Sequence, residues 1–327
     1  MRGRFTVVMV VLVLMGFCLT STLAVAAEEK YPSRPITLVC GFPPGGLGDI
    51  MNRLTGKYIE KYLKATVVPD NKPGGGGVVV SSNVARAKPD GYTVGNLGDY
   101  MITGVLLGQA PYKLEDLYVF AEISRSGRVL VVPADSPYKT IQDLVKAAKA
   151  NPGLKYGHPG VATIISMGMA SLNKHAGLKM IPVPFKGDME VISSVMGKHV
   201  PVGVTSAFAA APQAEAKKLR ILFSFEDPKS VGLDPSIPDL VKVFGKDVPD
   251  IPVSIILAVP AKTPKEIVSI LEQTIKKVTS DPGYVAELKK NHIAAKFTDG
   301  ETMMKKEIPR KIPILKDILK EAGMIKK

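Results

Sequence analysis

Two glycine-rich turns in this chain could bind an anion through backbone N–H groups. The first is CGFPPGGLGD, residues 40–49, and the second lies within KYGHPGVAT, residues 155–163. Each turn stands between a run typical of a strand and a run typical of a helix, so its N–H groups lie at the positive end of a helix dipole. The first turn lacks both the Gly-Lys-Ser/Thr and the six-residue spacing of nucleotide loops. We expect the two turns to face each other across a cleft and hold one carboxylate-bearing molecule.

The residue types that carry catalysis or bind metals are sparse. None of the four histidines has the spacing of a metal site, and only His158 lies in a candidate turn. No Gly-x-Ser-x-Gly nucleophile elbow is present. Once the amino-terminal segment is removed, Cys40 is the one cysteine left, which excludes an intrachain disulfide and a zinc–cysteine site. The sequence predicts a non-enzymatic binding protein with no cofactor and no metal. An exported enzyme, such as a hydrolase that uses the same cleft, is the alternative.

The elements that must position these turns follow an alternating pattern. Short β-branched runs alternate with helical patterns, which is typical of an α/β protein with largely parallel sheets. Capping residues mark two helix starts, Thr140 with Asp143, and Thr263 with Pro264 and Glu266. No low-complexity linker separates the halves. A chain of this length without a linker fits two lobes joined by crossing strands, with the cleft at their interface.

The amino-terminal residues predict export. Arg2 and Arg4 precede an unbroken apolar stretch, and STLAVAA then supplies the A-x-A pattern of signal-peptide cleavage. We expect a signal peptide over residues 1–26 and a periplasmic mature chain. A retained membrane anchor is the alternative. Phe17 stands before Cys18, where a lipoprotein signal requires a small residue.

The basic charge does not indicate nucleic-acid binding. The formal net charge is +13, from 43 Lys and Arg against 30 Asp and Glu. The lysines are scattered along predicted helices, the chain has no Trp, and aromatic residues do not alternate with basic ones. We expect solvated helix faces with an added attraction for anions, and no nucleic-acid partner.

The order of the motifs resembles the Bug/TctC family, the extracytoplasmic solute receptors of tripartite tricarboxylate transporters. The matching segments are YPSRPITLVCGFPPGGLGD, VVPDNKPGGGG, AKPDGYTVG, VPADSPYKTIQDL, YGHPGVAT, VPFKG and LKEAGMIKK. The resemblance implies an α/β, two-lobed fold of the type II periplasmic-binding-protein class, a Venus flytrap with its ligand cleft between the lobes. Lobe one would comprise residues 28–130 plus 254–327, and lobe two residues 131–253.

The resemblance also implies partners and binding residues. A monomeric receptor would capture a small organic carboxylate, close by a hinge motion and deliver it to the large and small membrane subunits of the transporter. A sensory receptor for a carboxylate is a further alternative. The implied ligand-binding residues are Phe42, Pro44, Gly45, Gly46, Leu47, Gly48, Asp49, Gly157, His158, Gly160, Val161, Ala162, Thr163, Phe185, Lys186, Thr205 and Ser206.

Several positions depart from the family pattern. Leu47 replaces a small or hydroxyl residue and His158 replaces a serine, while Pro201 and Thr205 stand at acidic positions. The cleft is therefore expected to be less polar than the family pattern, and its ligand to be a small acid with an apolar body. An ordinary dicarboxylate remains open if these side chains face the lobe core instead. The apolar candidates are Leu47, Val161, Ala162, Ile164 and Phe185.

Overall fold

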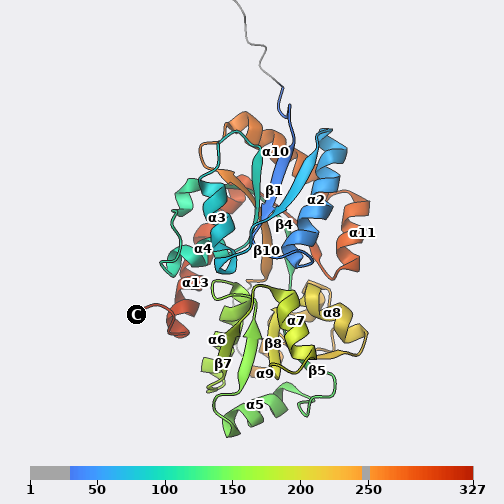
Figure 1. Ribbon diagram of the computed structural model, residues 1–327, viewed down its shortest axis with the longest axis vertical. Helices are drawn as coiled ribbons and strands as arrows, with labels where there is room; N and C mark the ends of the chain where they lie inside the picture. Colours follow the sequence, from blue (N-terminus) through green and yellow to red (C-terminus); the bar gives the residue numbers. More distant parts are fainter. Residues whose placement is uncertain (1–29, 245–250, 327) are drawn as a thin grey trace, which may run out of the picture. The chain divides into compact units, whose positions relative to one another are not determined.

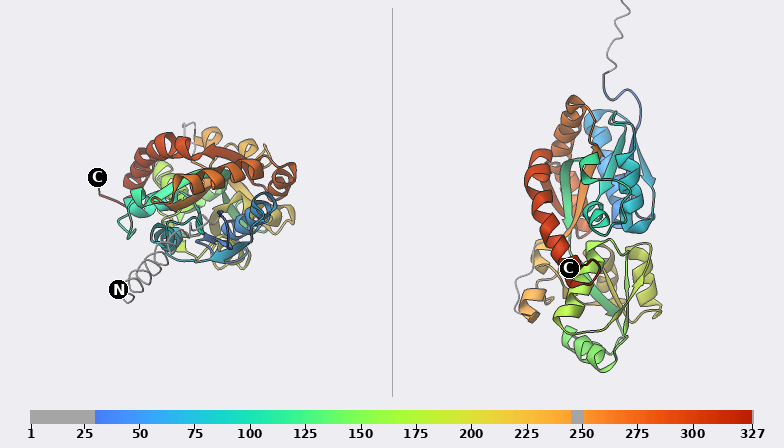
Figure 2. Two further views of the ribbon diagram at one scale, coloured as in Figure 1. Left: turned by 90° about the horizontal axis from the view of Figure 1, so that it is seen from above. Right: turned by 90° about the vertical axis from the view of Figure 1, so that its left-hand side faces the viewer.

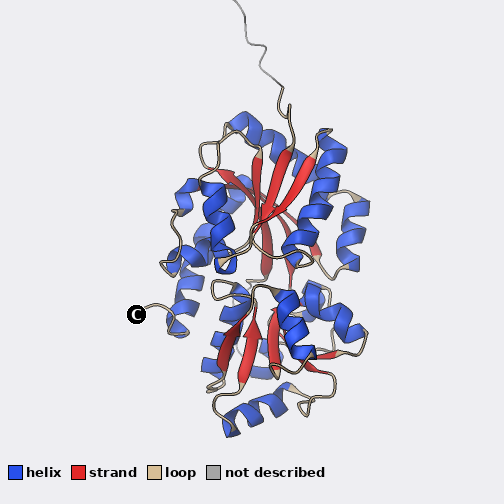
Figure 3. Cartoon of the chain, viewed as in Figure 1, coloured by secondary structure: helices blue, strands red, loops and turns tan. Residues whose placement is uncertain are grey.

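The computed structural model describes residues 30–244 and 251–326. The predicted signal peptide, residues 1–26, lies outside the described residues. The chain divides after Ser33, and the following description concerns the unit that begins at Arg34. Within that unit two sheets form two lobes, each covered by helices (Figures 1 and 3).

The sheet of lobe one has the strand order β11-β4-β10-β3-β1-β2. Strand β1 pairs in parallel with β2 and β3, whereas β10 runs antiparallel between β3 and β4. The strands are β1 (Ile36–Cys40), β2 (Val67–Asn71), β3 (Thr93–Leu97), β4 (Leu117–Ser126), β10 (Val253–Pro260) and β11 (Ala294–Asp299). The helices are α2 (Leu47–Leu63), α3 (Val78–Ala85), α4 (Tyr100–Leu106), α10 (Lys265–Thr279), α11 (Pro282–Lys290) and α13 (Ile308–Glu321). Short helical turns are η1 (Gly75–Gly77), η2 (Leu114–Asp116), α12 (Gly300–Thr302) and η4 (Met303–Glu307). In the right-hand view of Figure 2, α10 and α13 cover one face of this sheet, and α2 and α3 cover the other.

The sheet of lobe two has the order β7-β6-β8-β5-β9. Its interior strand β5 is buried at every position and is apolar from Val129 to Pro133, as expected for a strand covered on both faces. The strands are β5 (Arg128–Pro133), β6 (Lys155–His158), β7 (Ile181–Pro184), β8 (Val202–Ser206) and β9 (Leu219–Ser224). The helices are α5 (Ile141–Ala150), α6 (Ile164–His175), α7 (Asp188–Met196), α8 (Ala207–Glu215) and α9 (Leu240–Phe244), with a short turn η3 (Pro228–Val231).

The chain passes between the lobes twice. Strand β4 ends at Ser126 in one sheet and β5 begins at Arg128 in the other, with Gly127 between them. A side chain at Gly127 would collide with Val231, since its Cβ would lie 2.6 Å from Val231 Cγ2. The return passage ends where β10 begins at Val253.

Of the two helix starts predicted from capping residues, one is confirmed and one is wrong. Thr140 caps α5 and forms a reciprocal capping box with Asp143, so that prediction is confirmed. The prediction for α10 was wrong. Pro264 occupies the N-cap position without a side-chain hydrogen bond, and the Thr263 hydroxyl donates to the Pro260 carbonyl instead.

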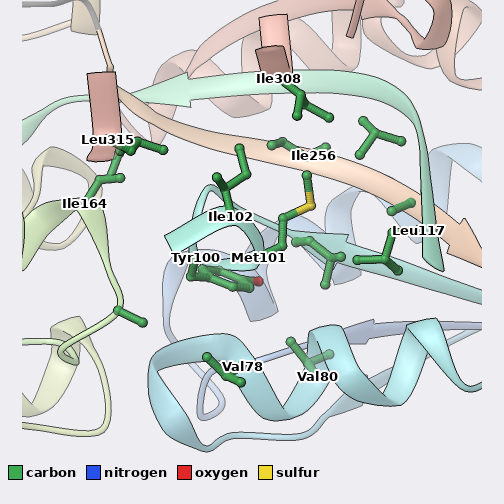
Figure 4. Packing of buried hydrophobic residues seen from close by; sticks show 14 of the residues in the cluster. Val78, Val80, Tyr100, Met101, Ile102, Leu117, Ile164, Ile256, Ile308 and Leu315 are labelled. Atoms are coloured by element: carbon green, nitrogen blue, oxygen red, sulfur yellow. The ribbon is translucent and has the colours of Figure 1, made fainter. Parts of the chain in front are cut away.

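One apolar core continues from lobe one into lobe two. Tyr100, Met101 and Ile256 are part of it in lobe one, together with Ile308 and Leu315 at the carboxyl-terminal end of the chain (Figure 4). Buried residues of α6, Ile164 among them, belong to the same cluster, and α13 packs against α6. A second cluster fills lobe two around β5 and β8. Helix α13 therefore contacts both lobes.

Candidate functional site

A cavity of about 80 Å³ lies between the two lobes. Its walls are formed by segments that follow β1, β3, β6 and β7, and by the start of β10. Binding sites of open α/β sheets are usual at the carboxyl ends of the strands.

Three helix amino termini meet at this cavity. Residues 46–48 begin α2 in lobe one, and residues 163–165 and 187–189 begin α6 and α7 in lobe two. The N-cap residues of α2 and α7 are glycines that provide no side-chain cap. The first N–H groups of a helix have no intrahelical acceptor, and the dipole makes this end favourable for an anion. The geometry can therefore hold a carboxylate from both lobes at once.

The charged side chains around the cavity are acidic. Asp99, Asp188 and Glu190 contribute to the lining, whereas no Lys, Arg or His of the described residues does. Backbone N–H groups and helix dipoles would thus have to stabilise the negative charge of an anionic solute in this site.

Asp188 is held by donors from β8. The Thr205 hydroxyl donates to Asp188 Oδ1 at 2.7 Å, the Ser206 N–H to the same oxygen at 3.1 Å, and the Ser206 hydroxyl to Oδ2 at 2.9 Å. Burial raises the pKa of Asp188 above its ordinary value, although these three hydrogen bonds act in the opposite direction. Thr205 and Ser206 therefore donate hydrogen bonds to Asp188. Asp188 lines the cavity, whereas Thr205 and Ser206 do not.

The first glycine turn is closed by Asp49. Its Oδ2 accepts the Gly45 N–H at 2.9 Å, and both carboxylate oxygens accept from Arg53 at 3.1 Å. Burial raises the pKa of Asp49, but the Arg53 guanidinium and the Gly45 N–H outweigh burial and hold the pKa below its usual value. This carboxylate thus fixes the turn that presents residues 46–48 to the cavity.

The remaining walls are largely apolar. Phe42 and Tyr100 stack edge to face with centroids 5.6 Å apart. Of the residues expected to make the cleft apolar, Leu47 and Ile164 line the cavity, and Val161, Ala162 and Phe185 do not. The apolar side chains that the sequence analysis missed are Tyr100, Ile165, Met189, Val253 and Ile255.

The predicted binding residues fall into two groups. Those that line the cavity are Phe42, Pro44, Gly46, Leu47, Gly48 and Thr163. Those that lie outside its lining are Gly45, Asp49, Gly157, His158, Gly160, Val161, Ala162, Phe185, Lys186, Thr205 and Ser206.

Much of the second glycine turn contacts lobe one instead of the cavity. An added Cβ at Gly160 would lie only 2.9 Å from Gly76 Cα, and the Ala162 carbonyl accepts from the Thr103 hydroxyl. Both contacts join lobe two to lobe one, so this turn seals the cleft beside the cavity. Val161 is 40% exposed.

The His158 side chain accepts a hydrogen bond from the backbone of the same turn. Its Nδ1 accepts the Gly160 N–H at 3.3 Å, and burial lowers the pKa of the imidazole. Two further predicted residues also have local roles. Phe185 packs against Gly157, and the Lys186 N–H donates to Glu190 at 3.1 Å.

The carboxyl end of β3 and the segment after it are the main contribution that the sequence analysis missed. Asn96, Gly98, Asp99 and Tyr100 line the cavity there. The available signal was the NLGD turn at the carboxyl end of a strand, where polar residues commonly face a ligand.

The comparisons with known proteins identify the family. A family model described as the tripartite tricarboxylate transporter family receptor matches residues 51–323. The chain belongs to this family, and the resemblance to Bug/TctC receptors is confirmed. A relative from Cupriavidus necator, "UPF0065 protein in gbd 5′region", is 34% identical over 275 residues, which cover 82% of this chain and 81% of the relative.

Solved structures are similar to this receptor over nearly their whole length. The periplasmic binding protein BugD gives a TM-score of 0.82 at 22% identity and covers 91% of this chain and 100% of its own. MatC from Rhodopseudomonas palustris, solved with bound malate, gives 0.79 at 20% identity and covers 88% and 100%. These similarities confirm the two-lobed periplasmic-binding fold.

Family membership also confirms the prediction of a solute receptor in place of an enzyme. No cluster of three or more His, Cys, Asp or Glu side chains suited to a metal ion occurs within residues 30–244 and 251–326. None of the helices in the described ranges combines the length and hydropathy that a bilayer crossing requires.

Proposed function

We propose that this receptor is exported to the periplasm, binds a small organic carboxylate between its lobes and delivers it to the membrane subunits of a tripartite tricarboxylate transporter. One observation carries the proposal. The amino termini of α2, α6 and α7 meet at one cavity, and no basic side chain of the described residues lines it. Backbone donors suit a carboxylate, and malate, which is bound in the MatC structure, is a carboxylic acid.

The division of the donors between the lobes couples binding to closure. Helix α2 belongs to lobe one, and α6 and α7 belong to lobe two. A carboxylate can contact all three only when the lobes are together, so the solute binds the closed conformation more tightly. It therefore shifts the population toward the form that membrane subunits would recognise.

The solute can be identified directly. Native mass spectrometry of receptor purified from periplasm, followed by denaturing release, is expected to yield a carboxylic acid and a chain that begins near Ala27. The acid at one hundred times its dissociation constant should stabilise the receptor by about 2.7 kcal/mol in a thermal shift. Recovery of a nucleotide or sugar, with no stabilisation by mono-, di- or tricarboxylates, would contradict the proposal. Uptake of the acid by cells with and without the receptor gene tests delivery.

A pair of variants tests the backbone donors. Leu47 is the first residue of α2 and follows Gly46 in an extended conformation, so proline is compatible with the fold at position 47. Leu47→Pro removes one N–H at the cavity, whereas Leu47→Ala removes the side chain and keeps the N–H. We expect Leu47→Pro to bind the acid at least tenfold more weakly than Leu47→Ala, since a hydrogen bond to a charged group contributes about 1.5–3 kcal/mol. Equal affinities would exclude this N–H from the site.

A further inference from the structure

The edges of the two sheets are the places where a strand of another chain could pair with this receptor. Within the described residues the edge strands are β2 and β11 in lobe one, and β7 and β9 in lobe two. An edge strand presents backbone N–H and C=O groups that have no partner inside its own sheet, and proteins use identifiable features to keep such edges from pairing. Each of these edge strands carries a feature of this kind.

The edges of β9 and β11 are interrupted. At β9 the Ser224 N–H donates to the Pro238 carbonyl at 2.9 Å, so a later segment of the chain covers the end of this edge. In β11 the register shifts between Ala295 and Thr298, and the exposed Lys296 lies within the shift. A bulge and a lysine both oppose the addition of a further strand.

The edge of β2 combines a carboxylate with a proline. The Lys72 N–H, directly after β2, donates to the Cys40 carbonyl at 2.8 Å. Backbone groups of successive residues point to opposite sides of a strand, so the even-numbered residues of β2 face β1 and the odd-numbered residues face outward. Among the outward residues, Val67 donates its N–H to Glu60 Oε1 at 2.8 Å, and Pro69 has no N–H.

The edge of β7 is both exposed and apolar. Its sequence is Ile-Pro-Val-Pro, three of these four residues are exposed, and Ile181 is 48% exposed. The Ile181 N–H donates to the Leu154 carbonyl at 2.9 Å, and the Phe185 N–H donates to the His158 carbonyl at 2.8 Å. By the same alternation, residues 181, 183 and 185 face β6, and residues 182 and 184 face outward.

Both outward positions of β7 are prolines, Pro182 and Pro184. If two copies of this edge paired antiparallel about Val183, residue 182 of one copy would stand opposite residue 184 of the other. Every hydrogen bond of that pair would have its donor at position 182 or 184. Because proline has no N–H, the edge offers acceptors only, and none of these hydrogen bonds can form.

We infer that Pro182 and Pro184 keep this receptor monomeric by preventing β7 from pairing with β7 of a second copy of the chain. A short exposed edge with apolar side chains, here Ile181 and Val183, otherwise favours such pairing. The inference goes beyond the proposed function, because none of the residues of β7 lines the cavity.

A double variant tests the inference. Pro182→Thr/Pro184→Thr restores both N–H groups, and threonine favours strands without adding apolar surface. In sedimentation velocity of the ligand-free receptor, wild type should be monomeric. The double variant should form dimers, with a dissociation constant at least tenfold lower than that of wild type.

The matched control is Pro137→Thr/Pro152→Thr. Both prolines are exposed, and they lie before and after α5, outside the strands of lobe two. This control gains the same two N–H groups and the same two threonines, but not at a sheet edge, so it should remain monomeric like wild type.

Hydrogen exchange locates the contact. The Ile181 and Phe185 amides donate to the strand β6 side of the sheet and should be protected in every variant. In Pro182→Thr/Pro184→Thr the amides at positions 182 and 184 should exchange rapidly in the dilute monomer and at least tenfold more slowly in the dimer. The single variant Pro184→Thr restores half of the donors and should dimerise more weakly than the double variant. It decides the question if the double variant does not fold.

Three results would overturn the inference. The first is a folded double variant that remains as monomeric as the control. The second is a dimer in which positions 182 and 184 exchange as rapidly as in the monomer. The third is a wild-type receptor that already dimerises with protection of β7. Each of these results leaves the proposed binding of a carboxylate untouched, because the variants do not alter the cavity lining.

Discussion

Asp188 offers a quantitative test of how the cavity wall is built. Asp188→Ala would remove the acceptor of the Thr205 hydroxyl and of both Ser206 donors, all of which are buried. At about 1 kcal/mol for each donor left without an acceptor, and with some relief from removing a buried carboxylate, we expect the free energy of unfolding to fall by about 2–3 kcal/mol. Thr205→Val removes one donor and should cost about 1–2 kcal/mol.

A double-mutant cycle isolates their interaction. Urea unfolding of the ligand-free receptor, followed by circular dichroism, gives the four free energies. The double variant should lose at least about 1 kcal/mol less than the sum of the single losses, because the donor removed in Thr205→Val has no acceptor in Asp188→Ala. Additivity within about 0.3 kcal/mol would show that the Thr205–Asp188 hydrogen bond has no energetic role.

The pH dependence provides an independent check with a definite sign. Burial raises the folded-state pKa of Asp188 above its ordinary value of 3.8. The folded state therefore binds the proton more tightly than the unfolded state, and stability falls as pH rises from about 4 through the raised pKa. Asp188→Asn does not titrate, so its stability relative to wild type should increase over that interval. A difference that stays constant or decreases with pH would refute the assignment.

Three further predictions concern the contact between the lobes at Gly160, the Arg128–Glu226 ion pair at the start of β5, and Cys40. Gly160→Ala should weaken solute binding at least tenfold by titration calorimetry because its Cβ would lie 2.9 Å from Gly76 Cα. Gly153→Ala, also at positive φ but with its nearest atom at 3.7 Å, should stay within about twofold, and equal effects would exclude the seal. Arg128→Leu removes the guanidinium that pairs with the buried Glu226 at 2.5 Å and should cost about 3–5 kcal/mol in urea unfolding; a loss below 1 kcal/mol would contradict a structural role. Cys40 is buried, which raises the pKa of its thiol to about 11, so a thiol reagent at pH 8 should label only unfolded receptor, and rapid labelling of the native chain would contradict this burial.

The sequence predicts the local elements of this receptor better than their contacts. The turn at residues 46–48 lines the cavity as expected, because a glycine-rich turn before a helix has few other arrangements. The turn at residues 157–163 has the same local pattern, but of its residues only Pro159 and Thr163 line the cavity. Gly160 and Ala162 contact Gly76 and Thr103, and no local pattern encodes a contact with a loop more than fifty residues away.

The acidic part of the lining was beyond sequence reasoning for the same reason. Asp99 meets Lys311, which is 212 positions away. Either residue alone resembles an ordinary surface charge. Only the packing of α13 against lobe one brings the pair together and buries it.

The absence of basic side chains from the described cavity lining has a consequence for the environment in which an exported receptor works. Ion pairs at a surface weaken as dissolved salt accumulates around them, whereas buried N–H groups and helix dipoles are screened far less. The affinity of the closed receptor for its solute should therefore change little with ionic strength. The rate of capture should fall with salt, because the positive net charge, +13 for the full chain and +11 without Arg2 and Arg4, attracts anions over long distances through solvent. As salinity varies, the affinity of the receptor for its solute should thus stay nearly constant, and only the speed at which the receptor fills should change.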